Sequence, residues 1–117
     1  MRKLKIYIAG PYSSAPEENV LKALKVADKL LEAGYIPIVP HLTHWWHEIS
    51  PKQYDTWIEI GKAQLENCDL LLRLPGESPG SDKEVAYAIK LGIPVIFNIG
   101  LLPLILRRHN RDHRENF

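Results

Sequence analysis

The sequence predicts a single α/β domain whose core is a parallel β-sheet with helices packed on its faces. Short apolar segments alternate with longer segments in which apolar residues recur every three or four positions, in a β-α-β-α order. Glycine and proline stand at the boundaries between these segments. The length of 117 residues matches one domain, and 45% apolar and 25% charged residues are ordinary for a globular protein. We therefore expect one domain over residues 1–117, with a solvated, frayed tail over about 107–117.

The first half of the chain is predicted to form two strands and one helix. Residues 4–9 form an apolar strand that stops at Gly10 and Pro11. The segment up to residue 33 carries apolar side chains at one-sided helical spacing, which predicts a helix packed on the sheet. Ser14-x-x-Glu17 has the form of a capping box at its start, and Gly34 suits its end. Residues 35–39 are predicted as the second strand.

The second half begins with a long connection over residues 40–51, which contains three histidines and two tryptophans. A loop of this length in a compact domain is usually functional. Helices are expected over about 53–67 and over 81–91, the latter closed by Gly92, and strands over 69–74 and 93–98. Residues 101–107 form a last helical turn or two, or their apolar side chains cover a partner subunit.

Charge and cysteine content exclude several classes of function. The net charge is only +1, from 15 basic and 14 acidic side chains, so no overall field attracts nucleic acid or an anionic membrane. The single cysteine, Cys68, excludes an internal disulfide and a cysteine-based metal cluster. The N-terminus lacks the pattern of a signal peptide, and no apolar run reaches the ~18 residues of a membrane span. We expect a cytoplasmic protein without nucleic-acid or membrane partners.

In an open parallel sheet, ligands bind in the crevice beyond the carboxyl ends of the strands. Residues 10–14, 40–47 and 75–84 should meet there. In the first of these segments, Gly10 allows a ligand to approach the backbone, and the next helix offers free N–H groups to an anion. The alternative for this segment is a plain junction between a strand and a capped helix.

The third crevice segment carries the strongest candidate for chemistry. Ser78, Gly80 and Ser81 lie just before a predicted helix, and hydroxyls beside helix amides suit a phosphate group. Glu84 lies one turn into that helix, where a carboxylate could attack an electrophilic sugar carbon. The alternative is structural, because Ser81-x-x-Glu84 is itself a capping box in which Glu84 only satisfies a backbone amide.

The middle crevice segment contains His41, His44 and His47 at steps of three. It lacks the H-E-x-x-H pattern and a suitably spaced cysteine or carboxylate, so we expect no metal site and no organic cofactor. Trp45 and Trp46 form a stacking wall for a base, or they cover the core or a subunit interface. Arg73, near the end of an apolar strand, needs an acidic side chain or a ligand anion as its partner.

An ordered set of motifs runs through about residues 3–97. It consists of Y-I-A-G-P-Y from Tyr7, P-H-L-T from Pro40, C-D from Cys68, L-R-L-P-G-E-S from Leu72, G-S-x-x-E from Gly80 and G-I-P-V from Gly92. This set resembles the nucleoside 2-deoxyribosyltransferase superfamily, and most of all its branch of small bacterial, archaeal and phage proteins. The resemblance implies a Rossmann-like, flavodoxin-type sheet with helices on both faces, a homodimer or homotetramer, and a nucleoside or nucleotide as ligand.

The resemblance also implies roles for individual residues. Glu84 matches the nucleophilic glutamate of the superfamily, and Tyr7 matches the strand-end tyrosine that orients it. Ser78, six residues before Glu84, stands where the deoxyribosyltransferases hold an aspartate and the nucleoside 5′-monophosphate N-glycosidases hold a phosphate-binding serine. The chain is thus predicted to cleave the base–sugar bond of a nucleoside 5′-monophosphate or a related nucleotide. The expected substrate contacts are Gly10, Tyr12, Ser13, His44, Trp45, Ser78, Gly80 and Ser81.

One position departs from the pattern of the superfamily. Its members generally carry an aspartate eight residues before the aspartate that opens the third strand, and this aspartate handles the base or donates a proton. Counting back from Asp69 reaches Gly61. Either another group such as His44 takes the acid role, or the chain is a non-catalytic nucleotide-binding module. A deoxyribosyltransferase is the further alternative.

Overall fold

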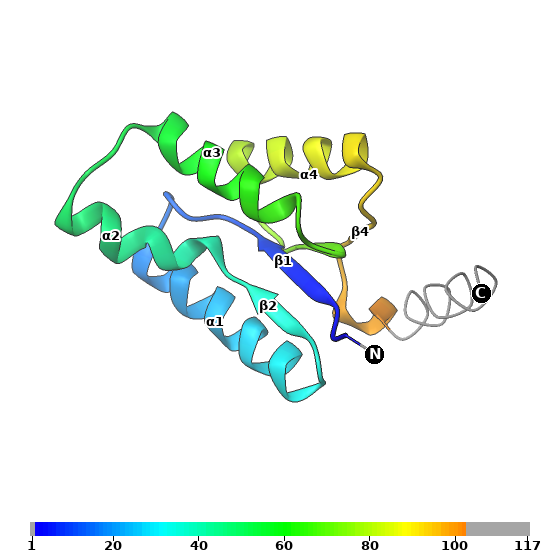
Figure 1. Cartoon of the computed structure of the whole chain (residues 1–117). Helices are drawn as coiled ribbons and strands as arrows, with labels where there is room; N and C mark the ends of the chain where they lie inside the picture. The colour runs from blue at the N-terminus through cyan, green and yellow to red at the C-terminus, as the bar shows by residue number, and fades with distance from the viewer. Residues whose placement is uncertain (1, 103–117) are drawn as a thin grey trace.

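The computed structural model describes residues 2–102 and contains a four-stranded parallel sheet in the order β2-β1-β3-β4 (Figure 1). The strands are β1 (Lys5–Ala9), β2 (Ile36–Ile38), β3 (Leu70–Arg73) and β4 (Val95–Ile96). The helices are α1 (Pro16–Glu32), α2 (Thr43–Ile49), α3 (Tyr54–Leu65) and α4 (Pro79–Leu91), with short 3₁₀ turns η1 (Pro40–Leu42) and η2 (Ile99–Leu101). This is the flavodoxin-type strand order, so the predicted fold class is confirmed.

The alternation of side chains along β1 divides the core into two halves. Ile6 and Ile8 face α1 and pack against Ala23, Ala27 and Leu30. Tyr7 and Ala9 face the opposite side, where they pack with Leu65 of α3 and Ala88 of α4. Figure 1 shows α1 on one face of the sheet and α3 and α4 on the other. A central strand buried on both faces explains why the segment reads as an unbroken apolar run.

The strand ends bring the crevice segments together. Ala9, at the end of β1, pairs with Arg73, at the end of β3. The next residue, Gly10, lies so close to β3 that an added Cβ would meet the Leu74 side chain at 3.0 Å. Glycine at this position therefore lets the segments that follow β1 and β3 leave the sheet side by side, at the same edge.

The connection over residues 40–51 was predicted as a loop, and this prediction is wrong. It contains η1 and the seven-residue helix α2. Pro40 occupies the first turn of η1, where its missing N–H costs nothing, and the Thr43 hydroxyl donates to the Pro40 carbonyl at 2.9 Å. These local contacts start a helix of only seven residues, which is too short for its apolar periodicity to be recognised in the sequence.

The helix starts also differ from the predicted caps. The residue before α1 is Ala15, which makes no side-chain cap, and Pro16 supplies a preset first turn. The Ser14 hydroxyl accepts from the Asn19 side-chain amide at 3.1 Å, so it ties down the loop and does not form a capping box. Helix α4 begins at Pro79, two residues earlier than expected, with Ser78 as its N-cap.

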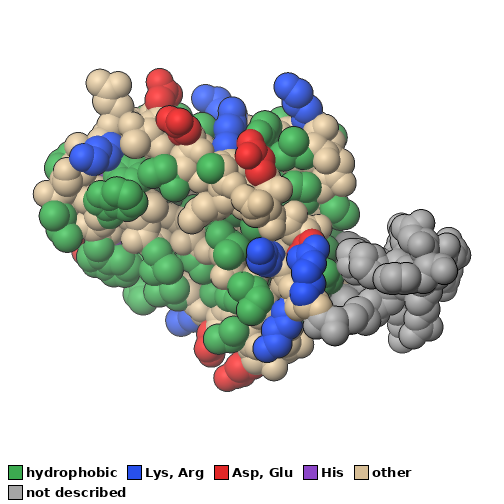
Figure 2. Space-filling model, viewed as in Figure 1, with side chains coloured by type: hydrophobic (Ala, Val, Ile, Leu, Met, Phe, Trp, Pro, Cys, Tyr) green, Lys and Arg blue, Asp and Glu red, His purple; other side chains and the backbone are tan. Residues whose placement is uncertain are grey.

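Large apolar side chains remain on the surface around α2. Leu42, Trp45, Trp46 and Ile49 are all exposed. Figure 2 shows hydrophobic side chains gathered on the side of the molecule where α2 lies in Figure 1. Among the helices of residues 2–102, none combines the length and the hydropathy that a membrane span requires. The helical turn expected at 101–107 and the tail beyond it fall almost entirely outside the described residues.

Candidate active site

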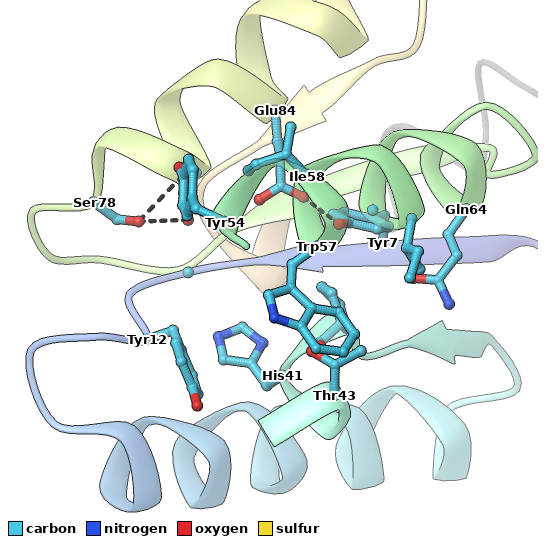
Figure 3. Close-up of a pocket in the computed structure, with 15 residues that line it drawn as sticks. Tyr7, Tyr12, His41, Thr43, Tyr54, Trp57, Ile58, Gln64, Ser78 and Glu84 are labelled. Atoms are coloured by element: carbon cyan, nitrogen blue, oxygen red, sulfur yellow. Dashed lines mark hydrogen bonds between the residues drawn. The ribbon is translucent and has the colours of Figure 1, made fainter. Parts of the chain in front are cut away.

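Glu84 and Tyr7 form a hydrogen-bonded pair at the carboxyl edge of the sheet. Glu84 projects from the second turn of α4, and the hydroxyl of Tyr7, from β1, donates to Glu84 Oε2. Figure 3 shows the two groups pointing toward one another. The Tyr7 side chain is fully buried, whereas Glu84 is partly buried and lines a cavity. The pair therefore joins a fixed donor to a carboxylate that a ligand can reach.

The capping-box alternative for Glu84 is wrong. The N-cap of α4 is Ser78, whose hydroxyl oxygen accepts from the Ser81 backbone N–H at 3.2 Å. Ser81 lies inside the helix, 2% exposed, and the Ser78 hydroxyl donates to its side-chain oxygen at 2.8 Å. The helix start is thus capped without Glu84, which leaves its carboxylate free to face the cavity.

The surroundings of the pair shift both acidities. Burial raises the pKa of Glu84 above its ordinary value of 4.5, while the Tyr7 hydrogen bond and the positive charge of Arg73 oppose that rise. Burial also raises the pKa of Tyr7 well above 10, and the neighbouring Glu84 charge adds to the effect. Tyr7 consequently stays protonated and can only donate to the carboxylate.

Arg73 is held in place by protein groups. Its guanidinium donates to the carbonyls of Leu74 and Gly76 and forms an ion pair with Asp82 at 3.2 Å. Of the two partners expected for this buried cation, the acidic side chain is thus the one found in the structure. Its charge still acts on Glu84 across the site.

Two adjoining cavities meet at this edge of the sheet. The smaller has a volume of about 140 Å³, and its lining includes Tyr7, Glu84, Gly10 and Ser81. The larger has a volume of about 520 Å³, and its lining includes Ser13, Gly80 and Lys52. The two share five lining residues, namely Tyr12, Thr43, Tyr54, Trp57 and Ser78. Eight of the ten predicted site residues therefore line one continuous hollow.

The other two predicted site residues, His44 and Trp45, line neither cavity. His44 is 6% exposed, with its Nδ1 2.5 Å from the Tyr12 hydroxyl. Trp45 packs edge-on against His44 with ring centroids 5.3 Å apart, and its other side is exposed. The helical geometry of α2 turns both residues away from the hollow, whereas a loop would have left their directions open.

Sequence reasoning missed the aromatic wall that α3 supplies. Tyr54, Trp57, Ile58 and Gly61 share one face of this helix and all line the smaller cavity (Figure 3). Trp57 is fixed by donating its indole N–H to His47 Nδ1 at 2.8 Å and by edge contact with Trp46. The signal was available as the i, i+3, i+4, i+7 spacing of these residues, which marks one side of a helix.

His41 is a second missed feature of the hollow. It is buried, lines the smaller cavity, and its Nε2 lies 3.1 Å from the Pro11 carbonyl. Burial lowers its pKa, so the ring is neutral at physiological pH and Nε2 donates to that carbonyl. In the sequence, His41 belongs to the histidine series and to the P-H-L-T motif, but neither pattern marked it as a site residue.

Gly61 lies directly against the candidate catalytic pair. A Cβ added there would meet the Tyr7 hydroxyl at 2.8 Å and Glu84 Oε2 at 3.5 Å. The position reached by counting back from Asp69 thus belongs to the site. It carries no carboxylate, and any side chain added there would have to displace the Tyr7 hydroxyl.

The fold is similar to two solved 2-deoxyribosyltransferase structures. For the protein from Leishmania mexicana, the TM-score is 0.63 at 21% sequence identity, covering 81% of this chain and 63% of that one. For the protein from Bacillus psychrosaccharolyticus, the TM-score is 0.58 at 19% identity, covering 83% of this chain and 79% of that one. This chain therefore spans less than two thirds of the Leishmania protein.

No curated protein sequence matches this chain. The family model described as "Domain of unknown function (DUF7768)" matches residues 4–98, which is most of the chain, and the protein therefore belongs to this family.

Proposed function

We propose that this protein is an N-glycosidase that cleaves the base–sugar bond of a nucleoside 5′-monophosphate, with Glu84 as the nucleophile. The observation that carries the proposal is the Tyr7–Glu84 pair beside a cavity that also receives the N-terminus of α4. A positioned carboxylate and an anion-binding helix end are the two features that this reaction needs.

The reaction would follow the retaining course of glycoside hydrolysis. One oxygen of the ionised Glu84 forms a bond to C1′ as the C1′–N bond breaks, and the bonding electrons leave with the base. The departing base takes up a proton from solvent. Water then attacks C1′ and gives its proton back to solvent, the ester bond to Glu84 breaks, and the sugar 5-phosphate is released with the carboxylate restored. Tyr7 holds the carboxylate through its hydrogen bond, so that one oxygen keeps a fixed direction.

The larger cavity favours a phosphorylated substrate. Ser78 and Gly80, at the start of the 13-residue helix α4, line it together with Ser13 and Lys52. The helix N-terminus, the hydroxyls and the Lys52 ammonium group suit a phosphate dianion, and the Glu77 carboxylate, which also lines this cavity, opposes them. The aromatic side chains of Tyr54 and Trp57, which line both cavities, offer apolar contacts to the sugar and the base.

The test is base release from a panel of ribo- and deoxyribonucleoside 5′-monophosphates and the matching nucleosides, followed by chromatography. Release from the monophosphates should disappear in Glu84→Gln, which keeps the shape of the side chain but removes the nucleophile. Glu59→Gln, an exposed glutamate on α3, is the matched control and should keep full activity. Release that persists in Glu84→Gln would contradict the proposal.

Two alternatives are distinguished by the same assay. A deoxyribosyltransferase would transfer the sugar to a second base when one is added, with Glu84 still essential. A non-catalytic nucleotide-binding module is favoured by Gly61, which places no acid beside the pair. That module would bind monophosphates saturably without releasing base from any of them.

A further inference from the structure

Three side chains that can ligate a metal converge between α1 and α2, outside the lining of both cavities. Glu17 comes from the first turn of α1, and His44 and Glu48 come from α2. One ligand atom from each lies within 4.8 Å of the other two. His44 and Glu48 are four residues apart and share a helix face, which lets both reach one ion. One imidazole and two carboxylates form a donor set that suits Zn²⁺ and its first-row neighbours.

The state of His44 is the independent observation that points to a ligand. Its side chain is 6% exposed, and its Nε2 is buried without a hydrogen-bond partner. The contact that this nitrogen makes is an ion pair with Glu48 Oε1 at 3.1 Å, which is not aligned as a hydrogen bond. Buried polar atoms are rarely left without a hydrogen bond, and a cation between this nitrogen and the two exposed carboxylates would supply the missing interaction.

The other ring nitrogen of His44 has a hydrogen-bond partner of its own. Nδ1 lies 2.5 Å from the Tyr12 hydroxyl. When Nδ1 carries the proton and donates to this oxygen, Nε2 presents its lone pair toward Glu17 and Glu48. Metal-binding histidines are commonly oriented by such a second hydrogen bond. His41 Nδ1 is likewise buried without a hydrogen-bond partner, but among the described residues only Glu17, His44 and Glu48 bring three metal-binding side chains together, and His47 accepts from Trp57.

We propose that Glu17, His44 and Glu48 bind one divalent first-row transition-metal ion, with Zn²⁺ as the representative ion. Bonds of about 2.0–2.2 Å place ligand atoms roughly 3–3.5 Å apart, so the carboxylates must move inward by only an ångström or two. Both glutamates are exposed and can do this by side-chain rotation while His44 stays in place. The site is independent of the proposed glycosidase, although Tyr12, which would orient His44, also lines both cavities.

Folding, and not spacing along the chain, creates this site. The sequence predicts no metal site, because no cysteine or carboxylate is suitably spaced around the three histidines. Glu17 lies on a different helix, and Glu48 becomes a neighbour of His44 only once residues 43–49 are helical. With residues 40–51 predicted as a loop, nothing in the sequence placed Glu48 beside His44.

The test is isothermal titration calorimetry of the full, chelator-treated chain with Zn²⁺ in the absence of nucleotide. One saturable site is expected, and Mg²⁺ should not compete because it prefers oxygen ligands. Glu17→Gln and Glu48→Gln should each weaken Zn²⁺ binding by about 10–100-fold or more, and Tyr12→Phe by about 10-fold or more. Both glutamates are exposed, so these variants avoid the unfolding that replacement of the buried His44 risks.

Glu18→Gln is the matched control, because Glu18 shares the first turn of α1 with Glu17 but is not among the three ligands. It should bind Zn²⁺ like the unchanged chain. X-ray absorption of the zinc-loaded protein should show oxygen and nitrogen neighbours with a single imidazole. Absence of saturable binding would overturn the proposal. So would Zn²⁺ binding that is unchanged in both Glu17→Gln and Glu48→Gln, because the ion would then lie elsewhere.

Discussion

At the scale of single residues, Glu84 has to be accessible to a ligand and also held in one direction. Burial alone would favour its protonated form, which is no nucleophile. The Tyr7 hydroxyl and the Arg73 charge both favour the ionised form. Tyr7 can act in this way because its own pKa is raised, so that it remains a donor throughout the physiological range.

Tyr7→Phe is therefore expected to raise the pKa of Glu84 further. The change removes a hydrogen bond to the ionised form and leaves the burial of the carboxylate in place. If Glu84 is the nucleophile, activity falls as pH drops through this pKa, and the acidic limb of the pH–rate profile should move to higher pH. An NMR titration of the Glu84 carboxyl carbon measures the same shift independently of activity.

The free energy of unfolding should also depend on pH through the protonation of Glu84. The pKa of Glu84 is higher in the folded chain than its ordinary value of 4.5, so the folded state binds more protons between those two values. The Glu84 contribution to the free energy of unfolding therefore decreases as pH rises through that window. Tyr7→Phe should extend this pH range to higher pH.

Tyr87→Phe, which removes a hydroxyl bonded to the exposed Glu66, is the control and should leave the pKa of Glu84 unchanged. An unshifted Glu84 titration in Tyr7→Phe would show that the hydrogen bond does not set its acidity.

Residue identity could be predicted from sequence where the backbone decides the direction of a side chain. Glu84 follows from a helix start at the carboxyl edge of the sheet, Tyr7 was implied by the resemblance to the superfamily, and both line the hollow. Trp45 and His44 were placed there too, but the short helix α2 carries them elsewhere. Trp57 lines the hollow in place of Trp45. Its segment was correctly predicted as helical, but Trp57 itself was not predicted as a site residue. The missing information was the angle at which α3 packs, which depends on contacts distant in sequence.

At the scale of elements, Ser78 caps the start of α4, and in the proposed function it also binds the substrate. Its hydroxyl caps the helix and faces both cavities. Ser78→Ala should lower the free energy of unfolding by about 0.5–2 kcal/mol through loss of the cap. It should also weaken the binding of nucleoside monophosphates relative to nucleosides. Chemical denaturation and calorimetry measure the two effects separately.

Ser78→Asp separates those two roles. Aspartate is as good an N-cap as serine and its charge suits a helix N-terminus, so the stability should be retained. The same charge repels a phosphate dianion, so the preference for monophosphates over nucleosides should be lost or reversed. A Ser78→Asp variant that still prefers monophosphates would place the phosphate away from α4.

Helix α3 contains Gly61 in its interior, although glycine destabilises a helix. Replacing an interior glycine by alanine usually stabilises a helix by about 1 kcal/mol. At Gly61, however, the new methyl group would lie 2.8 Å from the Tyr7 hydroxyl, which is fully buried and cannot swing aside. We expect Gly61→Ala to lower the free energy of unfolding by about 1–3 kcal/mol, as overpacking does.

A double-mutant cycle with Tyr7→Phe tests the cause of this cost. Without the hydroxyl, the nearest remaining atom is Glu84 Oε2 at 3.5 Å, which is an ordinary contact. Gly61→Ala should then be neutral or stabilising by up to about 1 kcal/mol, which gives a large coupling energy between the two sites. Urea denaturation of the four proteins measures it. Equal effects of Gly61→Ala in both backgrounds would mean that the glycine serves another contact.

The elements themselves could be predicted where they are long or fully buried. The strands β1 and β3 and the helices α1, α3 and α4 all lie within a few residues of their predicted bounds. The strand β2 has three residues and β4 has two, so their pairing with neighbours defines them more than their sequence does. Helix α2 was missed because seven residues with an exposed aromatic side give no clear apolar period.

At the scale of the whole molecule, the sheet separates a half with an aliphatic core from a half that carries the candidate active site. The α1 face holds an aliphatic core of Ile6, Ile8 and their partners. The opposite face also buries Tyr7, whose hydroxyl reaches Glu84 at the rim. One strand thus contributes both to the core and to the site, which explains how so short a chain can hold a buried carboxylate in a fixed direction.

The exposed apolar side chains of η1 and α2 lead to a prediction about assembly. Leu42, Trp45, Trp46 and Ile49 lie together on these two short helices, and Ile49 is 85% exposed. A monomer rarely leaves such a group in water, so we expect it to be buried between two copies of the chain. Sedimentation equilibrium should show a homodimer or a homotetramer.

Ile49→Lys should shift that assembly toward smaller species without unfolding the chain, because the side chain has few contacts within the protomer and a buried ammonium group is costly. Ile89→Lys places the same charge on α4, at a residue that is 65% exposed and outside the α2 group, and it should sediment like the unchanged protein. Because Trp57, against which Trp46 packs, also lines both cavities, dissociation should loosen one wall of the hollow and weaken nucleotide binding as well. A monomeric unchanged protein, or an Ile49→Lys variant with unaltered sedimentation, would mean that this apolar surface is not the interface.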